Sequence, residues 1–228
     1  MNIKIPKEVS EVLLHNTLDT LEFGNTSGKD RDLLHIVIPN PSMDEGMVDI
    51  NHSLFYKDVE NEIDHIYITP RGFVNGIITG SNTLFFEVLC DGLLEGTCLE
   101  FLDEYIEAFM TYKLMKAFIG IALRDLKQSR KPTAAQFKKE KWALEYTNMV
   151  RKFLGEDTTD FGGLSKDSIG YVRDLLNEVY EDGDINFSVP VDVYTELVRK
   201  VKRLNVRDNH FCVDLSPYYY NTWSENKL

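Results

Sequence analysis

Apolar residues follow two different periods along this chain, and the change falls near residue 100. Segments 31–38 and 63–69 are short, apolar and rich in β-branched side chains, which is typical of buried strands. From residue 101 onward, apolar residues recur every three or four positions, which is typical of amphipathic helices. The pattern predicts an α+β fold, with a mixed sheet and helices in residues 1–100 and a helical domain in residues 101–228.

Individual elements follow from the same pattern and from turn residues. In the first part we expect a helix that starts near residue 7 and runs into a strand ending at Phe23, a strand within 47–56, a helix opened by Pro70, and a helix over 84–94. In the second part we expect a long helix over 102–130, a helix closed by Gly155, a helix capped by Ser165, a helix opened by Pro190, and an aromatic C-terminal tail.

The stretch 21–39 organises the first part. Its short apolar run ends at Gly24, and two carboxylates, Asp30 and Asp32, stand at the start of the strand-like segment that follows. Residues two apart in a strand point to the same face, so these two carboxylates would project side by side. Such a pair repels unless a cation lies between its members. Oxygen ligands favour Mg²⁺ or Mn²⁺, so the spacing predicts a metal site.

The loop before these carboxylates is the candidate phosphate site. It contains Gly24, Asn25, Thr26, Ser27 and Lys29, and the backbone N–H groups of such a loop are able to hold a phosphate. The alternative interpretation is a solvated glycine-rich turn before an ordinary strand. These residues do not decide between the two interpretations.

Taken together, these motifs resemble the nucleotidyltransferase fold of the DNA polymerase β superfamily. The resemblance rests on a glycine and a small polar residue, a short loop, and Asp-x-Asp leading into an apolar strand. Residues 64–89 resemble one branch, the bacterial and phage predicted nucleotidyltransferases, in which an Asp-containing strand leads to a helix, a Gly-Asn turn, and a Glu within an apolar helix. The helical domain is consistent with the same branch.

The resemblance implies a metal-dependent nucleotidyltransferase that moves a nucleoside monophosphate from an NTP to an acceptor. It implies that Asp30, Asp32 and Asp64 are catalytic residues that hold Mg²⁺ or Mn²⁺, and that the loop residues hold the phosphates of the nucleotide. Asp58, Glu60 and Glu62 compete with Asp64 for the third position. Glu87 is expected to support the metal site or to form a structural salt bridge.

Charge restricts the acceptor only weakly. The formal net charge of −12 argues against a general nucleic-acid binder, but the basic segment 127–141 is able to guide RNA. An RNA end, a protein hydroxyl and a small molecule therefore all stay open. Three cysteines without metal-site spacing, no signal peptide and no apolar run as long as a membrane span predict a cytoplasmic protein without a membrane partner.

A second function class fits the same residues. This chain has Gly24-Asn25 where the family usually has Gly-Ser, which suits a catalytically degenerate protein that keeps the fold and acts as an interaction module. Metal-dependent NTP binding discriminates the two, because only the enzyme requires it. None of the five histidines has a recognisable pairing with a nucleophile, so the sequence gives no support to a hydrolase.

Overall fold

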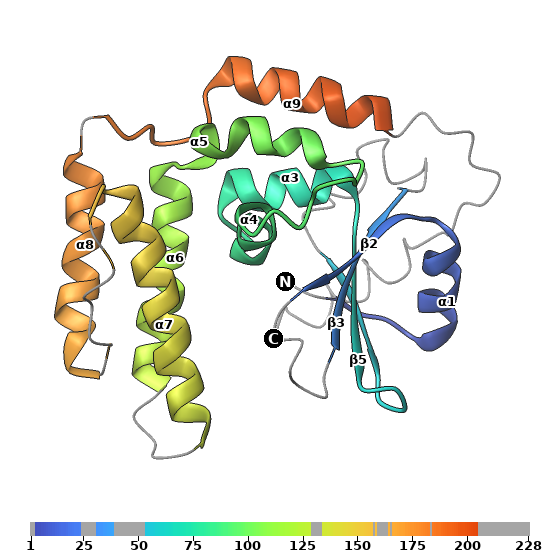
Figure 1. Cartoon of the computed structure of the whole chain (residues 1–228), viewed down its shortest axis with the longest axis horizontal. Coiled ribbons are helices and arrows are strands. Elements are labelled where there is room, and N and C mark those ends of the chain that lie inside the picture. The colour runs from blue at the N-terminus through green and yellow to red at the C-terminus, as the bar shows by residue number, and fades with distance from the viewer. Residues whose placement is uncertain are drawn as a thin grey trace, which may run out of the picture. The chain divides into compact units, whose positions relative to one another are not determined.

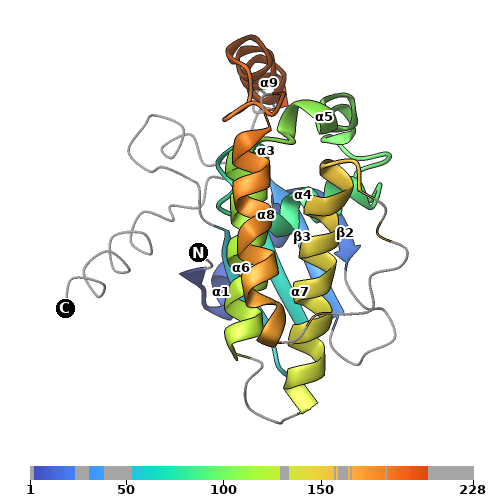
Figure 2. The ribbon, with the colours of Figure 1, turned by 90° about the vertical axis from the view of Figure 1, so that its left-hand side faces the viewer.

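The structure is a computed structural model that describes residues 3–23, 31–38, 53–128, 134–156, 158, 164, 166–182 and 184–204. It is an α+β structure with two compact units, each assembled from separate stretches of the chain (Figures 1 and 2). The first unit combines 1–76, 84–106 and 192–228, and the second combines 77–83 and 107–191. The predicted division placed the boundary after residue 100. The observed units differ from it, because the last helix (Val191–Leu204) belongs, from residue 192 onward, to the unit that contains the sheet.

The first unit contains a five-stranded mixed sheet with the order β1-β4-β5-β3-β2. The hairpin partner β2 is antiparallel to β3, β3 is parallel to β5, and β4 is antiparallel to β5. Helix α1 lies on one face, and α3 and α4 lie on the other (Figure 1). The bounds are β1 Ile3–Lys4, α1 Lys7–His15, β2 Thr17–Phe23, β3 Arg31–Val37, β4 Leu54–Asp58, β5 Ile63–Ile68, α3 Pro70–Thr79 and α4 Thr83–Cys90.

Both faces of the central strands are buried. Leu34 and Ile36 of β3 and Ile66 and Ile68 of β5 fill one face, and His35 and Tyr67 are buried on the other. A strand that is covered on both faces reads as a near-continuous apolar run, which is why the sequence pattern predicted these two strands correctly. The Ser10 and Tyr67 hydroxyls form a hydrogen bond that ties α1 to its face of the sheet.

Helix α9 (Val191–Leu204) packs against the 3₁₀ helix η1 (Glu100–Tyr105) within the first unit, from residue 192 onward. The Lys200 ammonium lies 3.1 Å from the Glu104 carboxylate and 4.7 Å from the centre of the Tyr105 ring. Leu197 and Val201 are buried on the same helix. The predicted opening of this helix at Pro190 is confirmed to within a residue.

The second unit is helical, as the sequence pattern predicts. Phe118 on α6 packs against Tyr146 on α7, and Tyr112 on α6 packs against Tyr180 on α8, each with ring centres 5.6 Å apart. Thus α6 contacts both of the other long helices. The bounds are α5 Ile106–Phe109, α6 Tyr112–Gln128, α7 Ala134–Phe153, η2 Lys166–Ser168 and α8 Ile169–Glu181. Ser168 stands at the N-cap of α8, and the predicted cap, Ser165, is outside the described residues.

Two predicted helices are shorter than expected. The single helix over 102–130 is interrupted before α6, because the Tyr112 and Lys113 N–H groups donate to the carbonyls of Asn186 and Phe187. The helix over 84–94 ends at Cys90, because Gly92 adopts a φ of +68°. There the Gly92 and following N–H groups bond back to the last turn in a Schellman arrangement.

In the described part of the chain, no single helix is long and apolar enough to cross a membrane. The bent pair formed by α3 and α4 passes that test by length and composition together. The residues of this pair are largely buried in the structure.

The α3–α4 turn approaches α6 closely at Gly80, and Gly92 provides a matched control for a test of that approach. Both follow a helix with φ near +65°, at +65° and +68°, so alanine costs each about 1–2 kcal/mol of backbone strain. A Cβ at Gly80 would lie 2.9 Å from the Lys113 carbonyl oxygen and 3.1 Å from the Ala117 Cβ, whereas none would crowd Gly92. We expect Gly80→Ala to destabilise the protein by about 1–3 kcal/mol more than Gly92→Ala in urea unfolding. Equal losses would show that this approach is not tight.

Candidate functional site

Two of the predicted metal ligands lie side by side. Asp32 is the second residue of β3 and Asp64 the second residue of β5, and the parallel register pairs them directly. Lys57 of β4 is the antiparallel partner of Asp64. Residues paired across neighbouring strands share a face, so these three side chains form one row at the end of the sheet face opposite α1.

Asp64 is more enclosed than Lys57, its ion-pair partner in this row. Its side chain is 24% exposed, and the Lys57 ammonium lies 3.2 Å from its Oδ1 atom. That Oδ1 atom is itself buried and accepts no hydrogen bond with normal geometry. Lys57 is 45% exposed, so this ion pair is screened by water and is worth about 1 kcal/mol or less. Asp64 therefore has spare capacity as an acceptor.

The competing acidic residues of the β4–β5 turn have other positions. Asp58 accepts hydrogen bonds from the backbone N–H groups of Glu60 and Asn61, at 3.1 and 3.2 Å, and from the Asn61 side chain at 2.7 Å. The Asn61 hydrogen bonds lower the pKa of the Asp58 carboxyl. Asp58 thus holds the turn, and by strand alternation it faces away from the row that contains Asp64. Glu60 and Glu62 are exposed in the turn itself.

The remaining predicted site residues are outside the described residues. These are the first carboxylate of the Asp-x-Asp motif and the phosphate loop: Asp30, Gly24, Asn25, Thr26, Ser27 and Lys29. Their roles stay predictions. Within the described ranges, no group of three His, Cys, Asp or Glu side chains is able to hold a metal ion. Asp32 and Asp64 alone are two carboxylates, and Asp30 is needed to complete the predicted set.

Glu87 lies at the middle of α4 and is partly buried, with its Oε1 atom fully enclosed. Its charge, together with that of Asp91, adds to burial in raising the pKa of the Cys90 thiol to about 11, with burial the larger cause. The surroundings of Cys90 are therefore acidic, and its thiol stays protonated at neutral pH. The supporting role of Glu87 at the metal site remains a prediction.

A second polar cluster, which the sequence did not predict, lies on the opposite face of the same strands. His35 Nε2 and His65 Nδ1 are 2.9 Å apart, and Thr20 Oγ1 lies 2.9 Å from His35 Nδ1. The His35 ring also stacks on Tyr67, with ring centres 4.7 Å apart. His35 and His65 are diagonal neighbours, because His35 pairs with Tyr67 and His65 pairs with Leu33.

This cluster favours neutral histidines. Burial, followed by the charge of His65, lowers the pKa of His35 to about 4, and burial also lowers the pKa of His65 against the opposing charges of Asp58 and Asp64. In the neutral pair one ring nitrogen donates and the other accepts. Full protonation would leave two N–H groups facing each other at this distance. The neutral histidines consequently link β3 to β5 through a side-chain hydrogen bond.

Comparison with family models, with curated proteins and with solved structures finds no match to this chain.

The histidine pair makes stability depend on pH. A histidine in the unfolded chain takes up a proton near pH 6.5, whereas folded His35 takes one up only near pH 4. The folded protein should therefore lose about 1–3 kcal/mol of stability as pH falls through that window. His35→Gln keeps polar groups in place but does not titrate, so urea unfolding at a series of pH values should show a shallower loss. The exposed His15 provides the control, since His15→Gln should leave the slope unchanged. A wild-type slope in His35→Gln would contradict this interpretation.

Proposed function

We propose that this protein is a metal-dependent nucleotidyltransferase of the nucleotidyltransferase fold, moving a nucleoside monophosphate from an NTP to an acceptor. The observation that supports the proposal most directly is the parallel register that pairs Asp32 with Asp64. It brings together two carboxylates separated by more than thirty positions along the chain, on one face and at one end of adjacent strands.

The donor set suits a divalent cation. Two neighbouring carboxylates raise each other's free energy unless positive charge offsets them, and Lys57 supplies only one positive charge. The buried Oδ1 atom of Asp64 accepts no hydrogen bond with normal geometry, although the Lys57 ammonium lies 3.2 Å from it, and we propose that it serves as an oxygen ligand. Oxygen-only ligands favour Mg²⁺ or Mn²⁺. We propose that Asp32 and Asp64 hold this ion together with Asp30.

The residues then take distinct roles. If these residues hold Mg²⁺, the ion would lower the pKa of the attacking hydroxyl and offset charge on the leaving phosphate. We propose that Asp64 accepts a proton from the acceptor hydroxyl. Gly24, Asn25, Thr26, Ser27 and Lys29 are proposed to hold the phosphates of the nucleotide, through backbone N–H groups, hydroxyls and one ammonium.

The acceptor stays open among an RNA end, a protein hydroxyl and a small molecule. In the basic segment 127–141, Phe137 is 76% exposed and the Lys138 ammonium lies 4.6 Å from the centre of the Trp142 ring. Exposed aromatics beside cations suit stacking on unpaired bases. The net charge of −12 restricts such binding to this local patch.

One observation favours the alternative function. Because Lys57 already contacts Asp64, its ammonium is able to take the place of a metal ion in a protein that has kept the fold and lost the chemistry. Such a protein would act as a protein-binding module without a metal requirement. The two functions differ in how NTP and Mg²⁺ bind.

Substitution of either aspartate tests the proposal. Asp32→Asn and Asp64→Asn each remove one negative charge at nearly constant volume, so calorimetry should show at least tenfold weaker binding of Mg²⁺–NTP than in the wild type. Glu60→Gln, an exposed carboxylate in the adjoining turn, serves as the control and should bind like the wild type. In wild-type protein, EDTA should abolish binding.

Unchanged Mg²⁺–NTP binding in both aspartate variants would exclude these residues as ligands. A wild-type protein that binds no NTP with any divalent metal would favour the interaction module. Incubation of active protein with labelled NTP and a cell extract would then show whether label enters RNA, protein or small molecules.

Lys57→Met separates a metal site from a permanent ion pair. Without metal, this variant leaves Asp64 beside Asp32 with no Lys57 ammonium, and it should lose about 0.5–1 kcal/mol of stability. If the carboxylates bind metal, millimolar Mg²⁺ should raise the melting temperature of Lys57→Met more than that of the wild type, because the competing ammonium is gone. If Lys57 replaces the metal, Mg²⁺ should restore nothing.

A further inference from the structure

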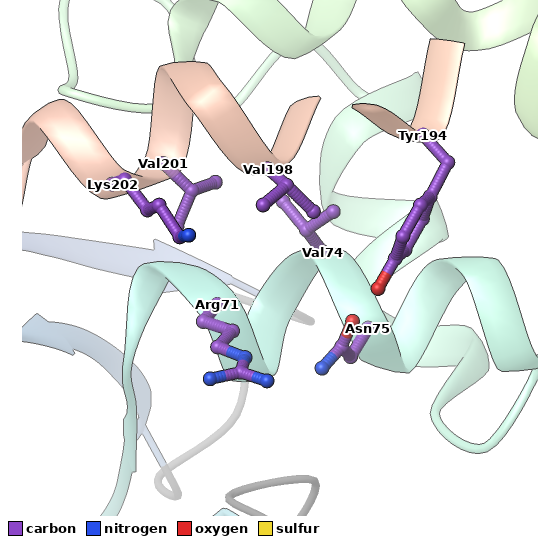
Figure 3. Close-up of a pocket in the computed structure, with 7 residues that line it drawn as sticks. All are labelled: Arg71, Val74, Asn75, Tyr194, Val198, Val201 and Lys202. Atoms are coloured by element: carbon purple, nitrogen blue, oxygen red, sulfur yellow. The ribbon is translucent and has the colours of Figure 1, made fainter. Parts of the chain in front are cut away.

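A groove lies between α3 and α9 (Figure 3). All of the residues that line it belong to the first unit. Its volume is about 280 Å³, near the lower end of the range for small-molecule sites. Figure 3 shows Arg71 and Lys202 toward one end, Tyr194 and Asn75 toward the other, and Val74 and Val198 between them. Each end of the groove thus has a different chemistry.

The cationic end has no acidic partner among the described residues. Arg71 and Lys202 are both exposed, and neither forms an ion pair within the described ranges. Lys202 lies in the last turn of α9, where the helix dipole favours a cation. Arg71 lies in the first turn of α3, which contains no acidic residue and where the dipole disfavours a cation. An anion at this end would offset the charges of Arg71 and Lys202 and the positive end of the α3 dipole.

The rest of the groove is apolar with a polar far rim. Val74 and Val201 are 4% exposed, and Val198 is partly buried. Tyr194 is 42% exposed, and its hydroxyl points toward the Asn75 side chain (Figure 3). A flat hydrocarbon group fits such a surface, because the valines exclude water beneath it and the tyrosine ring forms a wall.

The α9 wall is held in position independently of any ligand. The Lys200 ammonium, on the side of the helix that meets η1, pairs with Glu104 and lies over the Tyr105 ring. Lys202, two residues further along α9, is not used in this contact. Near the basic end of α9, Lys200 therefore anchors the helix and Lys202 lines the groove.

We infer that this groove binds a small organic phosphate monoester, with the phosphate between Arg71 and Lys202 and an aromatic or aliphatic body along Val74 and Val198 toward Tyr194. A phosphate dianion matches two cations, and Arg offers it two N–H groups at once. A volume of about 280 Å³ suits a ligand with a single ring.

This site is separate from the paired aspartates. Asp64 and Ile68 lie four residues apart on β5, so at about 3.3 Å per residue their Cα atoms are roughly 13 Å apart. Arg71 follows beyond Ile68, past the end of the strand. Ligand binding in the groove needs no divalent metal, so we expect it to persist in EDTA. If no ligand binds there, the proposed nucleotidyl transfer at the aspartates is unaffected.

Phenyl phosphate is a suitable probe, with inorganic phosphate and phenol as its two halves. In EDTA, calorimetry of the full chain should show phenyl phosphate binding at least tenfold more tightly than either half. Arg71→Gln and Lys202→Gln should each weaken it about tenfold, since each removes one charge-assisted contact. Arg199→Gln removes an exposed cation from the same helix outside the groove, and it should bind like the wild type.

Several results would overturn the inference. Phenyl phosphate that binds no better than inorganic phosphate would show that the apolar surface is not used. Equal weakening in Arg199→Gln would reduce the effect to general positive charge. An acidic peptide such as tetraglutamate that binds more tightly than phenyl phosphate, with the same dependence on Arg71 and Lys202, would assign the groove to a protein partner. The melting temperature of each variant serves as a folding control. Values within a few degrees of the wild type would show that a loss of binding is local and does not come from unfolding.

Discussion

The parallel pairing of β3 with β5 is the constraint on which both polar clusters of the sheet depend. Its register sets Asp32 opposite Asp64 on one face and makes His35 and His65 diagonal neighbours on the other. Side chains alternate along each strand, so a slip of one residue would exchange the faces of one strand and separate both pairs. Burial of Leu34, Ile36, Ile66 and Ile68 opposes such a slip, because it would take their apolar side chains out of the core.

The two faces of the sheet consequently differ in charge. On one, Asp32 and Asp64 bring negative charge together near the start of β3 and β5, and the Lys57 ammonium beside Asp64 offsets part of it. On the other, burial keeps His35 and His65 neutral beneath α1. Uncharged histidines on the buried face avoid an uncompensated charge in the core, whereas Asp32 and Asp64 are partly exposed to water.

Local pattern was sufficient to predict β3, β5 and the start of α3, because period, β-branched content and Pro70 are all contained within short windows. It was not sufficient for features made by distant contacts. Helix α6 begins after an interruption because Asn186 and Phe187 accept its first N–H groups, and α9 packs through Lys200 against Glu104, ninety-six positions away. The histidine pair was missed for the same reason: each residue appears isolated until the strand register is known. For the candidate site, the period-two spacing predicted that Asp30 and Asp32 share a face, but it could not fix the partner of Asp32 on β5.

The most direct test of the account is whether Asp32 and Asp64 bind a single cation. Substoichiometric Mn²⁺ added to isotopically labelled protein broadens backbone amide signals near the bound ion. The account predicts that the amides of residues 32 and 64 broaden together, before those of the exposed carboxylates Glu60 and Asp91, and that Asp64→Asn abolishes the broadening at residue 32. Broadening at residue 32 that persists in Asp64→Asn, or that appears only at the exposed carboxylates, would contradict a shared site.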